Sequence, residues 1–390
     1  MPDLADPASQ HASDGRRIVA VEADLLIARP HRGVTFAIGH YDEFAMVLVR
    51  VTTDDGLTGY GEAIARRGGE MTRAAVESLL APVLIGRDPR DIGGLWVAMM
   101  DRLRRWGHAG GVVVEAISGV DTALWDLAGK AAGAPIWALL HGAGRAEVPV
   151  YASSVYIDTD AAMVTDALEQ RDLGFTAIKI KIGRPPGDGG MRADVRAVAA
   201  IREAVGDGVA LMVDANGAYD AATAIRVARA LEDIEVTWLE EPVPPDDIDG
   251  YRRIHQMTST PLAAGESVFA VFGFRQLLAE GLIDYVQPDL GRCGGITAAM
   301  QIYALCYAAN KAFVPHTGFS GGVSQLAALH VAAAAPQLAT LEYMFIDNPA
   351  REIFVDGYPR PTDGVLTVPR GPGLGLELDH ERIEALIVRS

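Results

Sequence analysis

The feature that most constrains this chain is a regular alternation of short β-rich apolar runs with amphipathic helical segments, beginning at Val148. The intervening stretches space their apolar residues as helices do. Eight runs and their spacing favour a (β/α)7–8 TIM-like barrel over a doubly wound sheet, which would also alternate strands and helices. The runs are Val148–Val155, Ala177–Gly183, Ala210–Asn216, Val236–Pro242, Pro261–Ser267, Tyr285–Gly291, Ala312–Gly318 and Thr340–Phe345. The helical segments include Asp194–Val205, Ala221–Leu231, Ile296–Ala309 and Val323–Ala334.

The part of the chain before the barrel has strands first and helices afterwards. Strands are predicted over Ile18–Ala28 and Phe44–Thr53, with a hairpin turn at Asp54-Asp55-Gly56. Helices are predicted over Met71–Leu84, Leu95–Arg104 and Val113–Ala131. The expected organisation is a disordered tail (1–17), an α+β domain (18–137), the barrel (138–355) and a Pro/Gly-rich C-terminal segment (356–390) with a short helix at Glu381–Ile387.

Composition excludes several classes of protein. The chain has 34 basic and 51 acidic residues, a net charge of −17, which argues against a nucleic-acid partner. No apolar run approaches the roughly 18 residues of a membrane span, and no signal peptide is visible. Two cysteines, Cys293 and Cys306, suit a reducing cytoplasm.

Polar residues mark the carboxyl end of almost every predicted barrel strand. Because these ends meet at one mouth, the side chains should converge there. Three carboxylates on consecutive strands, Asp214, Glu240 and Glu266, would repel one another without a cation, and carboxylate oxygens suit Mg²⁺. Glu241 follows Glu240 directly and should point to the other side of the strand, so only one of the two is expected to be a metal ligand.

The second predicted strand carries two lysines, Lys179 and Lys181, on the face opposite its isoleucines. If the isoleucines pack against helices, both lysines point into the barrel, where a nearby cation and partial burial would depress the pKa of each and make it a general base. Asp289 and His316 end neighbouring strands and form a possible acid–base dyad, and Glu342 ends the last strand. Taken singly, such residues are also common as helix caps, ion pairs or solvated lysines.

Three motifs resemble signatures of the enolase superfamily, and within it of the mandelate-racemase-like subgroup. They are the stretch from Ala116 to Lys130 (AISGVDTALWDLAGK), Leu211–Asn216 (LMVDAN) and Trp238–Pro242 (WLEEP). Asp289 stands where the muconate-cycloisomerase-like subgroup would have a lysine. The resemblance implies a capping domain, completed by the C-terminal segment, that closes over the barrel. It also implies a dimer-based homo-oligomer, possibly an octamer.

The resemblance further implies roles for the strand-end residues. Asp214, Glu240 and Glu266 would bind Mg²⁺, and Lys181 would be the base on one face of the substrate, with Asp289–His316 acting on the other. Lys179 and Glu342, the latter if protonated, would contact the substrate carboxylate, and Asn216 its 2-substituent. The implied chemistry is removal of the proton α to a carboxylate, giving an enediolate.

The outcome after proton removal stays open at this point. Dehydration of a small anionic sugar acid to a 2-keto-3-deoxy acid is favoured, because the resemblance makes it the commonest activity. The alternatives are cycloisomerisation of an aldarolactone, racemisation or epimerisation of a 2-hydroxy acid, and a non-catalytic metal-stabilised binding barrel. Candidate residues of the capping loops are polar, which argues against an aromatic pocket: His31, Arg32, His40, Arg66 and Arg67.

Overall fold

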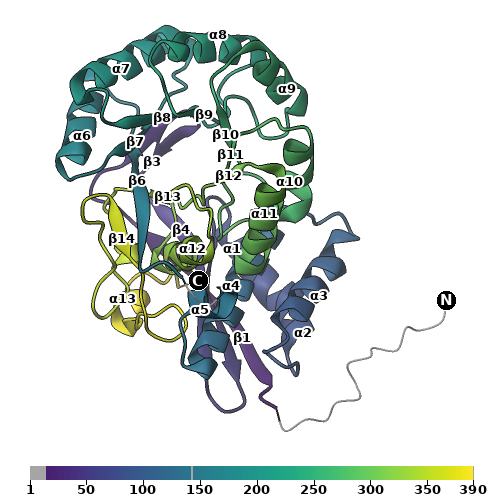
Figure 1. Ribbon diagram of the computed structural model, residues 1–390. Coiled ribbons are helices and arrows are strands. Elements are labelled where there is room, and N and C mark those ends of the chain that lie inside the picture. Colours follow the sequence, from purple (N-terminus) through teal and green to yellow (C-terminus); the bar gives the residue numbers. More distant parts are fainter. Residues whose placement is uncertain (1–14, 142–143, 390) are drawn as a thin grey trace.

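The computed structural model describes residues 15–141 and 144–389. Figure 1 shows a barrel whose helices form an outer arc, an N-terminal domain packed beside it, and a C-terminal segment running between the two. Most of the predicted tail lies outside the described residues. Its end is attached, however: Arg16 Nη2 lies 2.6 Å from Asp55 Oδ2, and Asp54 accepts a hydrogen bond from the Arg17 amide. The tail prediction is therefore too long at its carboxyl end.

The N-terminal domain is an antiparallel sheet covered by helices. The strand order is β1-β4-β5, and the turn between β4 and β5 is the predicted Asp54-Asp55-Gly56 hairpin. The long helix α4 packs on this sheet, and Gly59 and Gly61 of β5 permit the approach because a Cβ there would meet the α4 backbone. The strands are β1 (Ile18–Ala28), β2 (Val34–Phe36), β3 (Gly39–Tyr41), β4 (Phe44–Thr53) and β5 (Thr58–Ile64). The helices are α1 (Gly69–Ala75), α2 (Ala81–Leu84), α3 (Ile92–Arg104), α4 (Val112–Ala132) and α5 (Ile136–His141).

The predicted helix over Met71–Leu84 is interrupted. The segment Val76–Leu80 forms a π-helical turn, η2, between α1 and α2. Pro82 lies within α2, and a proline lacks the amide needed for a regular helical hydrogen bond. The other two predicted helices of this domain are present and slightly longer than expected.

The barrel consists of eight parallel strands in the order β12-β11-β10-β9-β8-β7-β6-β13. This confirms the predicted fold class. The strands are β6 (Glu147–Val155), β7 (Ala177–Lys181), β8 (Ala210–Asp214), β9 (Trp238–Glu240), β10 (Leu262–Ala264), β11 (Tyr285–Val286), β12 (Ala312–Phe313) and β13 (Leu341–Tyr343). The helices are α6 (Asp160–Asp172), α7 (Gly190–Val205), α8 (Ala221–Glu232), α9 (Ile248–Met257), α10 (Ala270–Ala279), α11 (Gly295–Ala309) and α12 (Gly322–Ala334).

Two details of the barrel differ from the prediction. Several strands end earlier than expected, so the polar residues of the later strands lie in the loops just beyond them. The last strand, β13, is followed by a single 3-10 turn, η4 (Pro349–Arg351), where the pattern predicted a helix after each strand. Within the described residues the barrel is therefore a (β/α)7β arrangement.

Buried polar groups of the N-terminal domain join it to the barrel. Glu62 of β5 accepts hydrogen bonds from the amides of Gly321 and Ser324 at the start of α12. Asp121 of α4 accepts from the amide and hydroxyl of Thr297 in the first turn of α11. Carboxylates at helix amino termini accept hydrogen bonds from amides that have no partner within the helix, and their negative charge interacts favourably with the helix dipole. The two domains are therefore held in a defined relation over the barrel mouth.

The C-terminal segment contacts both domains. Strand β14 (Val365–Thr367) pairs antiparallel with β6 of the barrel. Beyond helix α13 (His380–Glu384), the Val388 amide donates to Leu25 of β1, and the Ile27 amide donates to Leu386. The segment thus runs from the barrel to the N-terminal sheet.

A buried histidine helps to hold this segment and predicts a pH dependence of stability. His330 of α12 lies 3.0 Å through Nε2 from the carbonyl oxygen of Leu374, and burial lowers its pKa from 6.5 to about 4. The unfolded chain therefore binds the proton more readily, and the native state should lose about 2 kcal/mol from this group between about pH 8 and about pH 5. Urea unfolding at both pH values should show a smaller acid destabilisation in His330→Gln than in wild type.

The matched control is His255→Gln, which alters an exposed histidine at the end of α9. This variant should keep the wild-type difference in unfolding free energy between the two pH values. Equal acid destabilisation of His330→Gln and wild type would contradict the assignment.

Candidate active site

Strand register brings three of the predicted residues to one level of the barrel mouth. Lys181 of β7 is the register partner of Asp214 of β8, and Asp214 is the partner of Glu240 of β9. Lys181 Nζ donates a hydrogen bond to Asp214 Oδ2. All three side chains are buried, so a base candidate and two ligand candidates face one small volume.

Lys179 also points inward, but one layer deeper. Its register partner on β8 is Met212, which belongs with Tyr151, Trp238 and Val314 to the apolar cluster filling the barrel interior. Lys179 Nζ is 2.7 Å from Glu240 Oε1 and 2.8 Å from Glu342 Oε1, and the side chain is fully buried. Lys179 precedes Lys181 by two residues on β7, so both side chains point to the same side of the strand and Lys179 lies deeper in the barrel.

The charge state of Lys179 differs from the prediction. Burial lowers its pKa, but the carboxylates of Glu240 and Glu342 outweigh this effect and raise the pKa well above its ordinary value. The expectation of a depressed pKa is therefore wrong for Lys179. Its geometry is that of a cation that fixes Glu240 and Glu342 in place.

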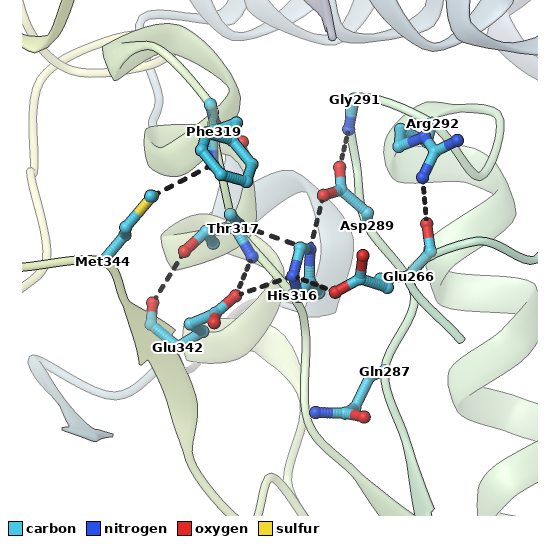
Figure 2. A network of polar contacts seen from close by, with 12 residues as sticks. Glu266, Gln287, Asp289, Gly291, Arg292, His316, Thr317, Phe319, Glu342 and Met344 are labelled. Carbon is cyan, nitrogen blue, oxygen red and sulfur yellow. Dashed lines mark hydrogen bonds and ion pairs between the residues drawn. The ribbon is translucent and has the colours of Figure 1, made fainter. Parts of the chain in front are cut away.

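His316 is the centre of a carboxylate network (Figure 2). Its Nδ1 lies 2.7 Å from Asp289 Oδ2, its Nε2 lies 2.7 Å from Glu266 Oε2, and Glu342 Oε2 is 3.3 Å from the same Nε2. Burial lowers the pKa of His316, but Glu266, Glu342 and Asp289 together raise it to about 10. The imidazole is therefore protonated near neutral pH and suited to donate a proton.

Glu342 is an acceptor in this arrangement. It accepts a hydrogen bond of 2.7 Å from the Thr317 amide, in addition to its contacts with Lys179 and His316. Burial raises the pKa of Glu342, but His316 and Lys179 bring it far below its ordinary range. The prediction that Glu342 is protonated and donates a hydrogen bond is therefore wrong, because the neighbouring His316 and Lys179 keep its carboxylate ionised.

The acidic residues fit a divalent cation. Metal-ligating atoms of Glu240, Glu266 and His316 lie within 4.8 Å of one another. This grouping shares Glu240 and Glu266 with the predicted ligand set but contains His316 in place of Asp214. Burial and the charge of Asp214 raise the pKa of Glu240 to about 7. Crowded carboxylates with raised pKa values and oxygen donors suit Mg²⁺.

Glu241 joins this cluster, contrary to the prediction that it points away. It lies just beyond the end of β9 with a φ of 34°, so the alternation of strand side chains does not extend to it. Burial and the charge of Glu266 raise its pKa to about 8, and its Oε1 is buried without a hydrogen-bond partner among the described residues. Glu241 is therefore a further oxygen donor available to a cation.

A small cavity of about 10 Å³ lies above these residues. Five predicted residues line it. The five are Lys181, Asn216, Glu266, His316 and Glu342. Asp214 contacts Lys181, Asp289 contacts His316, and Lys179 joins Glu240 to Glu342, although none of these four lines the cavity. The structure thus brings the predicted strand-end residues to one site.

The roof of this cavity is aromatic, which differs from the predicted polar cap. Phe36 from strand β2 and Phe319 from the loop after β12 lie with ring centroids 5.1 Å apart and line the cavity. Arg66 is the one polar cap candidate that lines this cavity, and its Nη1 lies 2.7 Å from Glu266 Oε1. Arg67 lies over the ring of Tyr41 instead. His31, Arg32 and His40 line a separate cavity.

Sequence reasoning did not single out several residues that shape the site. Trp238 and Gln287 both donate to Glu240 Oε2, at 3.0 and 2.7 Å. Gln287 precedes Asp289 by two residues and would share its face in the predicted strand Tyr285–Gly291, a signal that the pattern offered. Phe36, Phe319 and Tyr156 come from loops or strand ends whose position no periodicity encodes.

Two family models cover most of the chain. The mandelate racemase / muconate lactonizing enzyme N-terminal domain matches residues 19–141, and the enolase C-terminal domain-like family matches residues 162–382. The chain belongs to the enolase superfamily. The match to these two models confirms the mandelate-racemase-like resemblance predicted from the three motifs.

Relatives within the enolase superfamily include enzymes of two reaction types. The chain is 35% identical over 379 residues to the D-galactarolactone cycloisomerase of Agrobacterium fabrum, covering 94% of this chain and 98% of the relative. It is 34% identical over 412 residues to the D-xylonate dehydratase of Haloferax volcanii, covering 99% and 96%. Both relatives are aligned over nearly their full length.

A solved superfamily structure connects this fold with a metal. The crystal structure of a racemase from Streptomyces coelicolor with bound magnesium matches with a TM-score of 0.86 and 34% identity, covering 95% of this chain and 100% of that one. The carboxylate cluster of this enolase-superfamily chain fits the same type of ion. Among the residues that the structure describes, no helix is long and apolar enough to span a membrane.

Proposed function

We propose that the protein is a Mg²⁺-dependent sugar-acid dehydratase that removes the proton α to a carboxylate and eliminates the β-hydroxyl group, giving a 2-keto-3-deoxy acid. The observation that carries the proposal is the placement of Lys181 and the Asp289–His316 pair around one buried cavity. Strands β7 and β12 are separated by β6 and β13 on one side and by four strands on the other. The two groups can therefore act from different sides of a bound substrate.

Different residues of the chain would bind the metal, remove the α-proton and protonate the leaving group. Asp214, Glu240 and Glu266, with Glu241 close by, would hold Mg²⁺, which when bound supplies stabilisation of the second negative charge that develops on the substrate carboxylate. Lys181 takes the α-proton. His316, protonated and oriented by Asp289, gives a proton to the departing hydroxyl group, which leaves as water. The enol product then becomes the 2-keto acid.

A second candidate function is cycloisomerisation of a sugar lactone. The observation that favours it is the 35% identity to the D-galactarolactone cycloisomerase. In that reaction the same base removes the α-proton, and the leaving group is the lactone ring oxygen. The product then keeps the mass of the substrate, whereas dehydration gives a product lighter by one water.

The proposal is tested with purified Mg²⁺-loaded protein and a panel of aldonic acids, aldaric acids and their lactones. A carbonyl reagent detects 2-keto acids, mass spectrometry weighs them, and NMR in D₂O follows exchange of the α-proton. We expect at least one open-chain acid to give a 2-keto acid lighter by one water.

Other outcomes distinguish the alternatives. A 2-keto acid of unchanged mass from a lactone alone would favour the cycloisomerase. Exchange of the α-proton without any 2-keto acid would contradict dehydration and favour racemisation or epimerisation. Absence of both exchange and product across the panel would contradict the proposed function altogether.

A further inference from the structure

Glu62 of strand β5 connects the N-terminal domain to the loop that carries His316. Its side chain is only 2% exposed, and its carboxylate accepts hydrogen bonds from the amides of Gly321, at 2.6 Å, and Ser324, at 3.1 Å. Gly321 stands just before helix α12 and has no side chain to accept from the first amides of that helix, so a residue of the other domain does so. Burial of a carboxylate is costly unless such partners offset it. Glu62 is therefore tied firmly to one end of this loop.

The loop 316–321 carries two residues of the active site. His316 lies at its start, with Nδ1 2.7 Å from Asp289, and Phe319 lies within it and lines the catalytic cavity. Figure 2 shows both side chains on this segment. Phe319 has a φ of 62°, a left-handed conformation that is costly for a bulky residue, so the loop keeps this shape only while its surroundings hold it.

The contact between Glu62 and the loop is close. A Cβ built on Gly321 would lie 2.7 Å from Glu62 Oε2 and 2.6 Å from Met46 Sδ, nearer than ordinary contacts allow. Gly321 has a φ of −74°, which any residue can adopt. The glycine therefore provides space beside the Glu62 carboxylate, and its backbone conformation does not require it.

The same strand also holds the loop that carries Asp289. The Ile64 amide donates to the carbonyl oxygen of Gly291 at 3.2 Å, and a Cβ on Gly291 would lie 2.7 Å from Ile64 Cγ1. The Gly291 amide in turn donates to Asp289 Oδ1 at 2.9 Å. Glu62 and Ile64 are two residues apart on β5 and share a face of it, so one face of this strand contacts the loops of both Asp289 and His316.

We propose that Glu62 is a positioning residue for His316, which it keeps aligned with Asp289 and the cavity by anchoring the far end of the loop 316–321. The inference rests on the proposed function for the step that His316 performs. A misplacement of about 1 Å can cost about 100-fold in rate. Lys181 belongs to β7 and does not depend on this loop, so loss of the anchor should impair protonation of the leaving group and spare removal of the α-proton.

The first variant is Glu62→Gln in the Mg²⁺-loaded full chain. It keeps the shape of the side chain, but the amide nitrogen cannot accept a hydrogen bond. Assays are run at about pH 8, because burial raises the pKa of Glu62 from 4.5 to about 7 and the carboxylate is ionised above that value. We expect kcat for 2-keto acid formation to fall about 10- to 100-fold, with KM and α-proton exchange in D₂O within about 2-fold of wild type.

The second variant, Gly321→Ala, disturbs the same contact from the side of the loop. Its Cβ forces Glu62 or the loop to move, and the selective loss of 2-keto acid formation should appear again. Because both substitutions break one contact, the double variant should lose about as much as the weaker single variant, and not the product of the two losses.

The matched control is Asp121→Asn. Asp121 is an equally buried carboxylate of the same domain interface, and it accepts from the amide of Thr297 at the start of α11, at 2.8 Å. Glu62→Gln and Asp121→Asn should lower the melting temperature by similar amounts, about 2–6 °C. Asp121→Asn should nevertheless keep the wild-type ratio of 2-keto acid formation to α-proton exchange, which separates positioning from stability.

A measurement without substrate reports on the loop itself. Hydrogen–deuterium exchange with mass spectrometry should show at least about 2-fold faster uptake over 316–325 in Glu62→Gln and in Gly321→Ala, because amides that had acceptors become exposed. Asp121→Asn should leave uptake over 316–325 as in wild type.

The outcomes separate this inference from the proposed function. Equal losses of exchange and product in folded Glu62→Gln, wild-type turnover in Gly321→Ala, or the same selective loss in Asp121→Asn would each overturn the positioning role. If wild type forms no 2-keto acid, the dehydratase proposal fails, and deuterium uptake then decides alone. Faster uptake over 316–325 in both variants would support the anchoring role of Glu62, and unchanged uptake would overturn it.

Discussion

Replacement of Lys181 by methionine is expected to lower kcat for 2-keto acid formation by about 10²- to 10⁴-fold, the usual contribution of a positioned general base. The same variant should lose exchange of the substrate α-proton in D₂O. The physical reason is that Lys181 lines the catalytic cavity, whereas Lys179 lies a layer deeper between two carboxylates. Stopped assays for 2-keto acid and NMR of the recovered substrate check both expectations.

Replacement of His316 by asparagine separates the two halves of the reaction. Product formation should fall by a similar factor, because the departing hydroxyl loses its proton donor. Exchange of the α-proton should persist, since Lys181 remains in place. Loss of exchange in His316→Asn together with full exchange in Lys181→Met would reverse the assignment of acid and base.

A matched control exists for the lysine variant. Lys311 precedes strand β12, at the opposite end of the barrel, and lies 3.0 Å from Asp284. Lys311→Met also removes a lysine with an ion-pair partner, but it should leave kcat within about 2-fold of wild type, because ion pairs outside the site act on stability alone. A large loss of kcat in Lys311→Met would show that the Lys181 effect is not specific.

Removal of Mg²⁺ by a chelator is expected to abolish turnover and to lower the melting temperature. A ligand that binds only the native state at about 100 times its Kd contributes about 2.7 kcal/mol. Burial and the charges of neighbouring carboxylates raise the pKa of Glu240 from 4.5 to about 7 and that of Glu241 from 4.5 to about 8, so the metal-free chain loses stability as the pH rises from about 4.5 to about 8. Stabilisation by Mg²⁺ should therefore be larger at about pH 8.5 than at about pH 6.

Differential scanning fluorimetry with and without Mg²⁺ measures this effect. Glu240→Gln should lose most of the Mg²⁺-dependent shift in melting temperature. Glu232→Gln is the matched control, because Glu232 is an exposed carboxylate at the end of α8. Turnover and melting temperature that survive complete chelation would contradict a Mg²⁺-dependent site.

Local periodicity was enough to predict the barrel and the identity of most site residues. A strand buried on both sides gives an apolar run, and the polar residue at its carboxyl end stands out against that run, as Asp214, Asp289 and His316 do. The inward direction of both lysines followed from the isoleucines between them, which pack in the helix-facing core. These inferences needed only the alternation of side chains along one strand.

Register, depth and charge state were decided by the tertiary structure. Lys179 lies below Lys181, and Glu342 is an ionised acceptor, because pKa values depend on partners that the chain brings from distant strands. Glu241 turns into the site because its strand ends one residue earlier. The aromatic roof, and the separate cavity lined by His31, Arg32 and His40, arise where the cap loop meets the barrel, and no repeat within either segment encodes that contact. The sequence by itself thus determined which groups the site contains, and long-range packing determined their depth, their protonation and the space left for a substrate.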